Sequence, residues 1–199
     1  MSYRHLLYLA GMLTTAACSS PSETASEHAA PVETGESIAT ATAGPVLRVI
    51  ERRRLFATPN APDVFRLELL GDSLLSASAL LIIRTATGQE LYRQELRPGE
   101  LEAALVYELK AGEQPSRARR EAYLRQRRAE FFSDDKFTSP AIGPEEAMQP
   151  EYADLPTWNS LKLPGTVGFS FQVGKEDGHR IAWVPAKKKV LRYAGFGGG

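Results

Sequence analysis

The sequence Asp177-Gly178-His179 places an imidazole beside a carboxylate, with Glu176 directly before them. A positioned histidine of this kind can take up or release a proton in a reaction. The pair Asp177-Gly178 is also typical of a hairpin turn, and a histidine that follows such a turn is more often a solvated side chain. No second positioned group accompanies His179 in the sequence, so we assign no catalytic residue here.

Metal and cofactor sites are not expected. His5 and His28 lie within the first 44 residues, which leaves a single histidine for the rest of the chain. The only cysteine, Cys18, lies in the same N-terminal part. Because zinc sites need several such ligands, and because the motifs H-E-x-x-H, C-x-x-C, the P-loop and the EF-hand loop are all absent, we expect no metal and no cofactor.

Two short sequences look like nucleophile motifs of hydrolases. SDDK, Ser133 to Lys136, fits the S-x-x-K motif of penicillin-binding proteins and serine β-lactamases, in which the serine begins a helix. Here the serine follows an expected helix, and the companion triplets S-D-N and K-T-G are absent. GFSFQ, Gly168 to Gln172, starts like a nucleophile elbow but lies in a strand pattern and lacks the second glycine. Neither motif predicts a catalytic serine.

Residues 116–132 form the most strongly charged segment, with six arginines against two glutamates. The segment has a serine at the cap position and no internal glycine or proline, so it predicts a helix. Its arginines could form a basic surface for anionic partners, and we include Arg120 and Arg127 in a possible binding surface. The spacing favours a self-neutralising face instead, because Glu121 lies four residues before Arg125, and Arg127 lies three residues before Glu130.

Aromatic residues complete the possible binding surface. Tyr152 and Trp158 lie in residues 136–165, which contain five prolines and are expected to form a long irregular loop. Such a loop is either pinned to the core by its apolar residues or forms one wall of a binding site. For Trp158, a place in the core is favoured over a role as a sugar-stacking platform.

Cys18 ends a stretch that resembles the lipobox of bacterial lipoproteins. Leu6 to Ala17 is apolar or small, follows Arg4, and is shorter than the roughly 20 residues that span a bilayer. The resemblance implies cleavage before Cys18, a diacylglycerol on its sulfur and acylation of the new amine. At the third position before the cysteine, where the lipobox usually has Leu, Val or Ile, this chain has Thr15. The alternative is an ordinary signal peptide cut after Ala17, or an uncleaved anchor, with a free thiol.

The composition changes along the chain and predicts four parts. Residues 1–17 are expected to be the signal peptide, and residues 18–44, rich in Ser, Thr, Ala, Glu and Pro, a lipid-attached disordered tether. Residues 45–194 are expected to fold as a single α+β domain, and residues 195–199 to be a flexible tail. By the same resemblance, Ser19, in place of an aspartate, favours the outer membrane.

Within the domain, hydrophobic alternation predicts an antiparallel sheet and a C-terminal meander. The clearest strand is residues 64–70, in which apolar residues alternate with Arg66 and Glu68. A short helix is expected within residues 101–109, and a helical turn at 144–148. The fold class is therefore α+β, an antiparallel sheet packed with one or two helices and followed by a three-stranded meander. The strands are expected at residues 46–56, 64–70, 79–85, 89–96, 166–174, 180–185 and 187–196.

The phrases FRLELLGDSLL, FTSPAI, VGFSFQVGKEDGHRIAWV and KKKV, within residues 64–193, resemble small uncharacterised bacterial lipoproteins of the envelope. This resemblance implies a location and no activity. We expect a lipid-anchored cell-envelope protein that acts by binding or scaffolding, with the membrane and an envelope protein or glycan as partners. The balance of 24 basic and 24 acidic residues, together with the export signal, disfavours nucleic acid.

Two other functions remain open. The first is a small cell-wall or glycan hydrolase that uses paired carboxylates, because twenty acidic residues lie beyond residue 45 and their proximity in the fold cannot be predicted. The second is an inhibitor of an envelope hydrolase, which would present a rigid exposed loop such as residues 139–164. A facing pair of acids in a cleft favours the hydrolase, whereas an apolar or aromatic groove favours binding.

Overall fold

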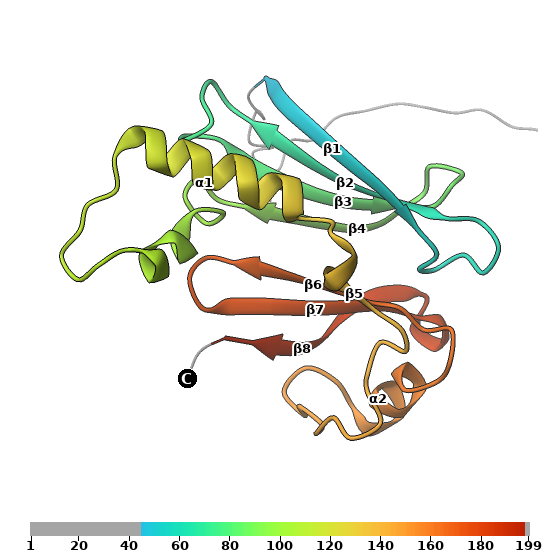
Figure 1. The fold of residues 1–199 in the computed structure, drawn as a ribbon. Helices are drawn as coiled ribbons and strands as arrows, with labels where there is room; N and C mark the ends of the chain where they lie inside the picture. Colours follow the sequence, from blue (N-terminus) through green and yellow to red (C-terminus); the bar gives the residue numbers. More distant parts are fainter. Residues whose placement is uncertain (1–44, 198–199) are drawn as a thin grey trace, which may run out of the picture. The chain divides into compact units, whose positions relative to one another are not determined.

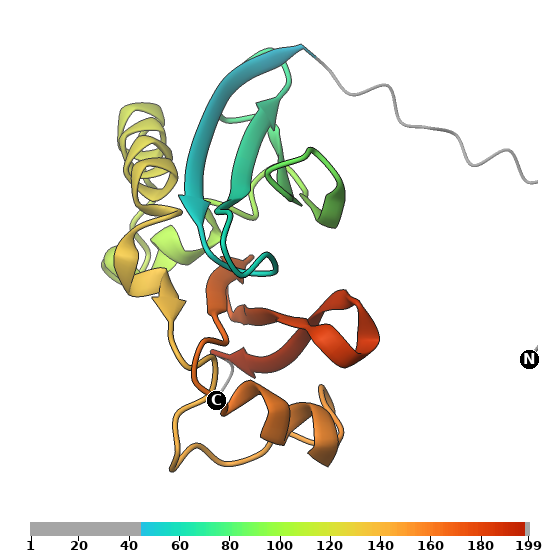
Figure 2. The same cartoon turned by 90° about the vertical axis from the view of Figure 1, so that its right-hand side faces the viewer.

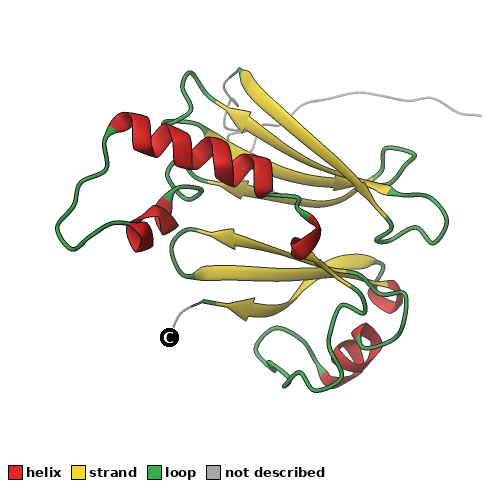
Figure 3. Cartoon of the chain, in the orientation of Figure 1, coloured by secondary structure: helices red, strands yellow, loops and turns green. Residues whose placement is uncertain are grey.

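The computed structural model describes residues 45–197. The expected signal peptide, the lipidation site at Cys18 and the tether lie outside the described residues. In the described part, no helix is both long and apolar enough to span a bilayer. Two four-stranded antiparallel sheets and a few helices make up this part, which confirms the α+β class (Figure 3).

The first sheet is a meander in the order β1-β2-β3-β4 (Figure 1). Its core face comes from the period-two pattern that the sequence showed, because Phe65, Leu67 and Leu69 of β2 are all buried. Among the described residues, β1 forms one edge of the sheet and pairs only with β2. The strands are β1 (Val46–Arg54), β2 (Asp63–Leu70), β3 (Ser78–Arg84) and β4 (Glu90–Leu96).

A helix, α1 (Arg117–Glu130), lies along one face of the first sheet (Figures 1 and 2). Ser116 caps it as expected, since its side chain accepts a hydrogen bond from the backbone N–H of Arg119. The short helix expected within residues 101–109 is a 3₁₀ helix, η1 (Ala103–Glu108), of which only Leu105 is buried. A single buried residue gives an α-helix little packing support, so the tighter short form is reasonable here.

The second sheet has the order β5-β6-β7-β8. Its last three strands are the expected C-terminal meander, and a two-residue strand, β5, is added at the β6 edge. The expected turn at Asp177-Gly178 is wrong by a few residues, because both residues already pair with β6. The turn instead uses Gly174, whose φ of +68° suits glycine. The strands are β5 (Phe137–Thr138), β6 (Gly168–Val173), β7 (Asp177–Val184) and β8 (Lys189–Phe196).

Two further 3₁₀ helices and one short α-helix complete the described fold. They are η2 (Asp134–Lys136), η3 (Pro185–Lys187) and α2 (Leu155–Leu161). The expectation that residues 136–165 form a purely irregular loop with a helical turn at 144–148 is therefore wrong. Asp154 caps α2 by accepting from the N–H of Thr157, and Pro156 lies in its first turn, where proline costs no hydrogen bond.

One aromatic cluster joins the first sheet, α1 and the second sheet. The ring of Phe65 is fully buried and lies 5.2 Å from Phe169 of β6, 5.2 Å from Phe137 and 6.1 Å from Phe132. A second, separate cluster lies between α2 and the second sheet and includes Trp158. The two clusters together hold the elements that position the surfaces described below.

Candidate functional site

Most arginines of α1 are neutralised, as the charge spacing predicted. Glu121 accepts from Arg125 at 2.9 Å, which confirms the expected pair. Arg127 does not form the other expected pair, because Glu130 accepts instead from the amide of Gln126 at 3.0 Å. Among residues 45–197, Arg127 forms no ion pair. The remaining pairs are Arg117 with Glu121, Arg119 with Glu108, and Arg120 with Glu102.

Arg127 lines a small cavity at the C-terminal end of α1. The cavity has a volume of about 130 Å³ and extends to β6 and the end of β8, so we call it the α1–β6 cavity. Three phenyl rings, Phe131, Phe171 and Phe196, form part of its wall. Its polar lining consists of Arg127, Glu130, Lys136, Ser170 and Gln172.

Most of these polar groups already have partners. The ammonium of Lys136 lies 2.8 Å from Asp135, and this bond, with a further one from Ser133, holds the pKa of the Asp135 carboxyl below its ordinary value. Ser170 donates to the carbonyl of Lys136, while the Gln172 amide donates to a neighbouring backbone carbonyl. The guanidinium of Arg127 is different, because its Nε is buried and has no acceptor. Its Nη groups also form no hydrogen bond with the described residues, and they, rather than the enclosed Nε, can reach an incoming ligand.

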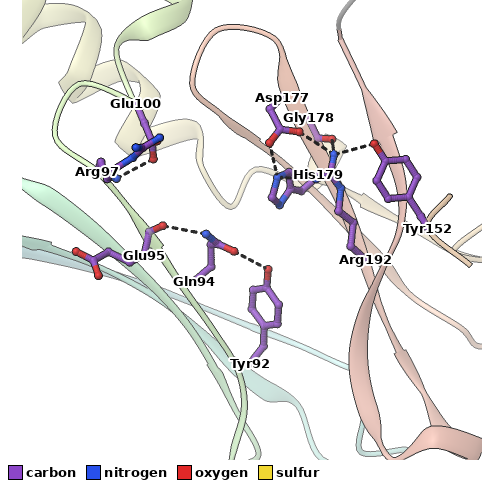
Figure 4. A network of polar contacts seen from close by, with 10 residues as sticks. All are labelled: Tyr92, Gln94, Glu95, Arg97, Glu100, Tyr152, Asp177, Gly178, His179 and Arg192. Carbon is purple, nitrogen blue, oxygen red and sulfur yellow. Dashed lines mark hydrogen bonds and ion pairs between the residues drawn. The ribbon is translucent and has the colours of Figure 1, made fainter. Parts of the chain in front are cut away.

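A second polar group lies where the second sheet faces β4 (Figure 4). Nε2 of His179 lies 2.9 Å from Oδ2 of Asp177 and 3.0 Å from Nη1 of Arg192. Nη2 of Arg192 donates to Oδ1 of Asp177 at 2.7 Å, and its guanidinium lies 4.5 Å from the centre of the Tyr152 ring. These four side chains tie β7, β8 and the loop before α2 together, and Tyr92 of β4 lies near them.

The expectation that His179 is a solvated turn residue is wrong. It belongs to β7, pairs with Phe171 of β6, and its side chain is only 12% exposed. Its Nε2 can donate to Asp177 or accept from Arg192, but a single nitrogen cannot do both. Since both neighbours compete for this atom, Nε2 is not free to remove a proton from a substrate. The arrangement favours a structural role for His179.

The electrostatics of this group fit that role. Desolvation raises the pKa of Asp177, but hydrogen bonds from His179 and Arg192 outweigh it and leave the pKa below its ordinary value. Asp177 therefore stays ionised near neutral pH and holds the guanidinium. Arg192 was not among the residues singled out from the sequence, and the only signal for it was its position in a strand opposite the His179 strand.

The four side chains of the expected binding surface do not come together as one surface. Trp158 is only 2% exposed and packs against Tyr193, 6.4 Å between ring centres, so it presents almost no surface to a ligand. Tyr152 supports Arg192 in the group around His179. Arg120 pairs with Glu102 beside η1. Arg127 alone lines the α1–β6 cavity.

The carboxylates in two of the described cavities are held by other groups. One cavity contains Glu51 and Asp134, which pair with Arg66 and with Arg52. Another contains Glu102 and Glu113, and these bond to Arg120 and to the backbone N–H of Lys110. In both cavities the carboxylates bond to cations or N–H groups and not to each other. This geometry gives no support to a pair of catalytic acids at these places.

The two nucleophile-like motifs are placed as the sequence predicted. Ser133 follows the end of α1, and its hydroxyl oxygen lies 2.8 Å from the carbonyl oxygen of Glu130. Gly168 to Gln172 lie in the strand β6. Within residues 45–197, no group of three or more His, Cys, Asp or Glu side chains is arranged to hold a metal ion.

Comparison with known proteins gives no match. The chain fits no model of a protein family. No curated protein and no solved structure is significantly similar to it. Its function has therefore to be inferred from the residues and contacts described above.

Proposed function

We propose that the chain is a lipid-anchored cell-envelope protein whose folded part binds a small ligand with an anionic group and an apolar body. The lipobox-like sequence before Cys18 supports the anchor. The α1–β6 cavity supports the binding role. The observation that carries the proposal is the Arg127 guanidinium, which lines an aromatic-walled cavity and forms no ion pair or hydrogen bond with the described residues.

The cavity suits such a ligand in size and in chemistry. Apolar cavities of about 150 Å³ bind benzene, so about 130 Å³ accepts one ring or a short apolar chain. A carboxylate or similar oxyanion could accept two parallel hydrogen bonds from the Nη groups of Arg127, which have no acceptor among the described residues. Phe131 and Phe171 would cover the apolar part of the ligand. Glu130 is bonded to Gln126 at the rim, which reduces its competition for Arg127.

Binding can be tested with benzoate and benzyl alcohol as probes of equal ring size. Titration calorimetry of the full chain should show tighter binding of benzoate, by about 10- to 100-fold, because a hydrogen bond to a charged group contributes about 1.5–3 kcal/mol. Arg127→Met keeps the apolar stem and should remove this preference. Arg97→Met, at an arginine whose side chain is 83% exposed, is the matched control and should leave it intact. Equal affinity of the two probes for the unsubstituted chain contradicts the proposed site.

The anchor is tested separately. Mass spectrometry of the chain made in a bacterial host that processes lipoproteins should show an acylated N-terminal Cys18. The Cys18→Ala variant should move from the membrane fraction to the aqueous fraction, because stable anchoring needs at least two acyl chains. A bare thiol at Cys18, or equal membrane retention of the variant, overturns the anchor without affecting the binding test.

A further inference from the structure

A second cavity is lined by other residues of α1 and lies where three separate segments meet. The start of β1 contributes Arg48, the loop between β2 and β3 contributes Asp72 and Ser73, and α1 contributes Arg125 and Arg128. Its volume is about 330 Å³. We call it the three-arginine cavity.

The charges in this cavity are unbalanced. Three arginines face one acid, Asp72, and no ion pair joins Asp72 to any of them within the described residues. Arg125 has a partner outside the cavity, but it shares that carboxylate, Glu121, with Arg117. A net positive charge therefore remains among the lining groups.

Among residues 45–197, two of the three guanidinium groups also lack an acidic partner. Arg48 donates there only to the backbone carbonyl of its neighbour Leu47, at 3.2 Å. The Arg128 Nε is enclosed by the protein, but its Nη groups form no ion pair or hydrogen bond with the described residues. An oxyanion in the cavity can therefore accept charge-assisted hydrogen bonds from Arg48 and from the Nη groups of Arg128.

Guanidinium groups recognise phosphate through paired, parallel hydrogen bonds, and several arginines can share the oxygens of one phosphate. The hydroxyl of Ser73 lies in the same lining and adds a neutral donor or acceptor, while Leu47 and Leu74 add apolar wall. A volume of about 330 Å³ is more than one phosphate needs, so an attached glycerol or sugar also has room. The polar lining suits the phosphate group of a phosphate ester, and the apolar side chains suit the organic group that is attached to it.

We propose that the three-arginine cavity binds the phosphate group of a phosphate ester, with the headgroup of an anionic phospholipid as one source and a soluble phosphate ester as the other. This site is separate from the α1–β6 cavity and does not depend on the ligand proposed there. A headgroup bound here would hold the folded part against a bilayer surface in addition to any acyl anchor.

The matched pair of variants removes the same charge from different places. Arg48→Gln with Arg128→Gln removes two cations from the cavity. Lys110→Gln with Lys189→Gln removes two exposed cations that line none of the described cavities and form no described ion pair. All proteins carry Cys18→Ala in the full chain, so that acyl chains do not bring them to a membrane.

The first measurement uses vesicles of phosphatidylcholine with and without phosphatidylglycerol. The chain should sediment with the anionic vesicles, and the cavity variant should bind them about 30-fold more weakly, since each cation near such a surface contributes about 1 kcal/mol. The lysine variant should retain the affinity of the parent. Equal losses in the two variants would mean that binding follows net charge alone, and this overturns the site.

The second measurement uses glycerol 3-phosphate and inorganic phosphate against chloride at equal ionic strength. Phosphate should raise the thermal midpoint of the parent and of the lysine variant, but not that of the cavity variant. A phosphate effect without vesicle binding supports the site and assigns it to a soluble ester. Absence of both effects in the parent overturns the proposal. If the cavity variant fails to fold, Arg128→Lys, which keeps the charge but not the paired geometry, should still weaken phosphate binding.

Discussion

The rings of Phe65 and Phe169 meet edge to face, with 5.2 Å between their centres and 71° between their planes. Phe65 belongs to β2 and Phe169 to β6, so this contact joins the two sheets. Phe65→Ala should lower the free energy of unfolding by about 3–5 kcal/mol, because it removes a buried ring and leaves a cavity. Urea denaturation of both proteins measures this difference in the free energy of unfolding. Leu163→Ala, at a side chain that is 58% exposed, should change stability by no more than about 0.5 kcal/mol. Similar small effects of both substitutions would contradict the described core.

Asp63 is fully buried and holds the turn between β1 and β2. Its carboxylate accepts from the N–H groups of Ala57 and Thr58 and from the Thr58 hydroxyl, at 2.6–3.1 Å. Asp63→Ala should cost about 1–3 kcal/mol, because donors in the turn lose their acceptor. Asp72→Ala, at an exposed acid in the next loop, is the control for loss of one carboxylate. Chemical unfolding of both variants would show whether the loss belongs to Asp63 alone.

The lowered pKa of the Asp154 carboxyl predicts that the folded chain loses stability in acid. Hydrogen bonds from Thr157 and then Lys187 lower its pKa from 3.8 to about 2. Since the folded pKa is the lower one, the stabilisation is complete above about pH 4 and is lost as the pH falls towards 2. Asp154→Asn should therefore lower the thermal midpoint at pH 6, and the difference from the parent should shrink between pH 4 and 2. Glu151→Gln, at a neighbouring exposed acid, should show no such trend. A difference that is constant with pH would refute this assignment.

The raised pKa of the Tyr92 phenol predicts that the folded chain loses stability at high pH. Burial raises the pKa of its phenol from 10.0 to about 12, although Arg192 acts in the opposite direction. Because the folded pKa is the higher one, the stability that this group contributes is present below pH 10 and is lost as the pH rises through 12. The pKa values of Tyr107, Tyr123 and Tyr193 are raised as well, so several phenols should titrate late. In an ultraviolet titration, Tyr92→Phe should remove one tyrosinate from the absorbance change near pH 12. An unchanged amplitude there would mean that the assignment to Tyr92 is wrong.

The strands and α1 could be predicted because local sequence and tertiary packing agree there. Phe65, Leu67 and Leu69 alternate with polar residues, and the buried side of β2 follows that alternation. The helix α2 was missed because Pro156 was read as a breaker, although proline is tolerated in a first helical turn after a cap such as Asp154. The short helix near residue 105 was predicted, but its 3₁₀ form could not be, because the spacing alone does not show how few of its residues are buried.

Only part of the candidate site could be predicted from the sequence. Arg127 was singled out by charge, but its pairing was mispredicted because Gln126, at i,i+4 spacing, bonds to Glu130 instead. Arg48 and Arg128 are eighty residues apart, and only the packing of α1 against the first sheet brings them to one cavity. Periodicity carries no information about such long-range pairs.

The charge on the edge strand β1 affects how two copies of the chain associate. Arg52, Arg53 and Arg54 follow one another along this outermost strand, and β1 has a strand partner on only one side among the described residues. Arg52 and Arg54 share one carboxylate, Asp134, so a net positive charge remains among the three arginines. Two such edges approaching each other bring like charges together, which discourages pairing of exposed strands between molecules. Salt near 1 M shortens the range of that repulsion to about 3 Å. Intermolecular pairing through β1 should therefore begin only at high salt concentration.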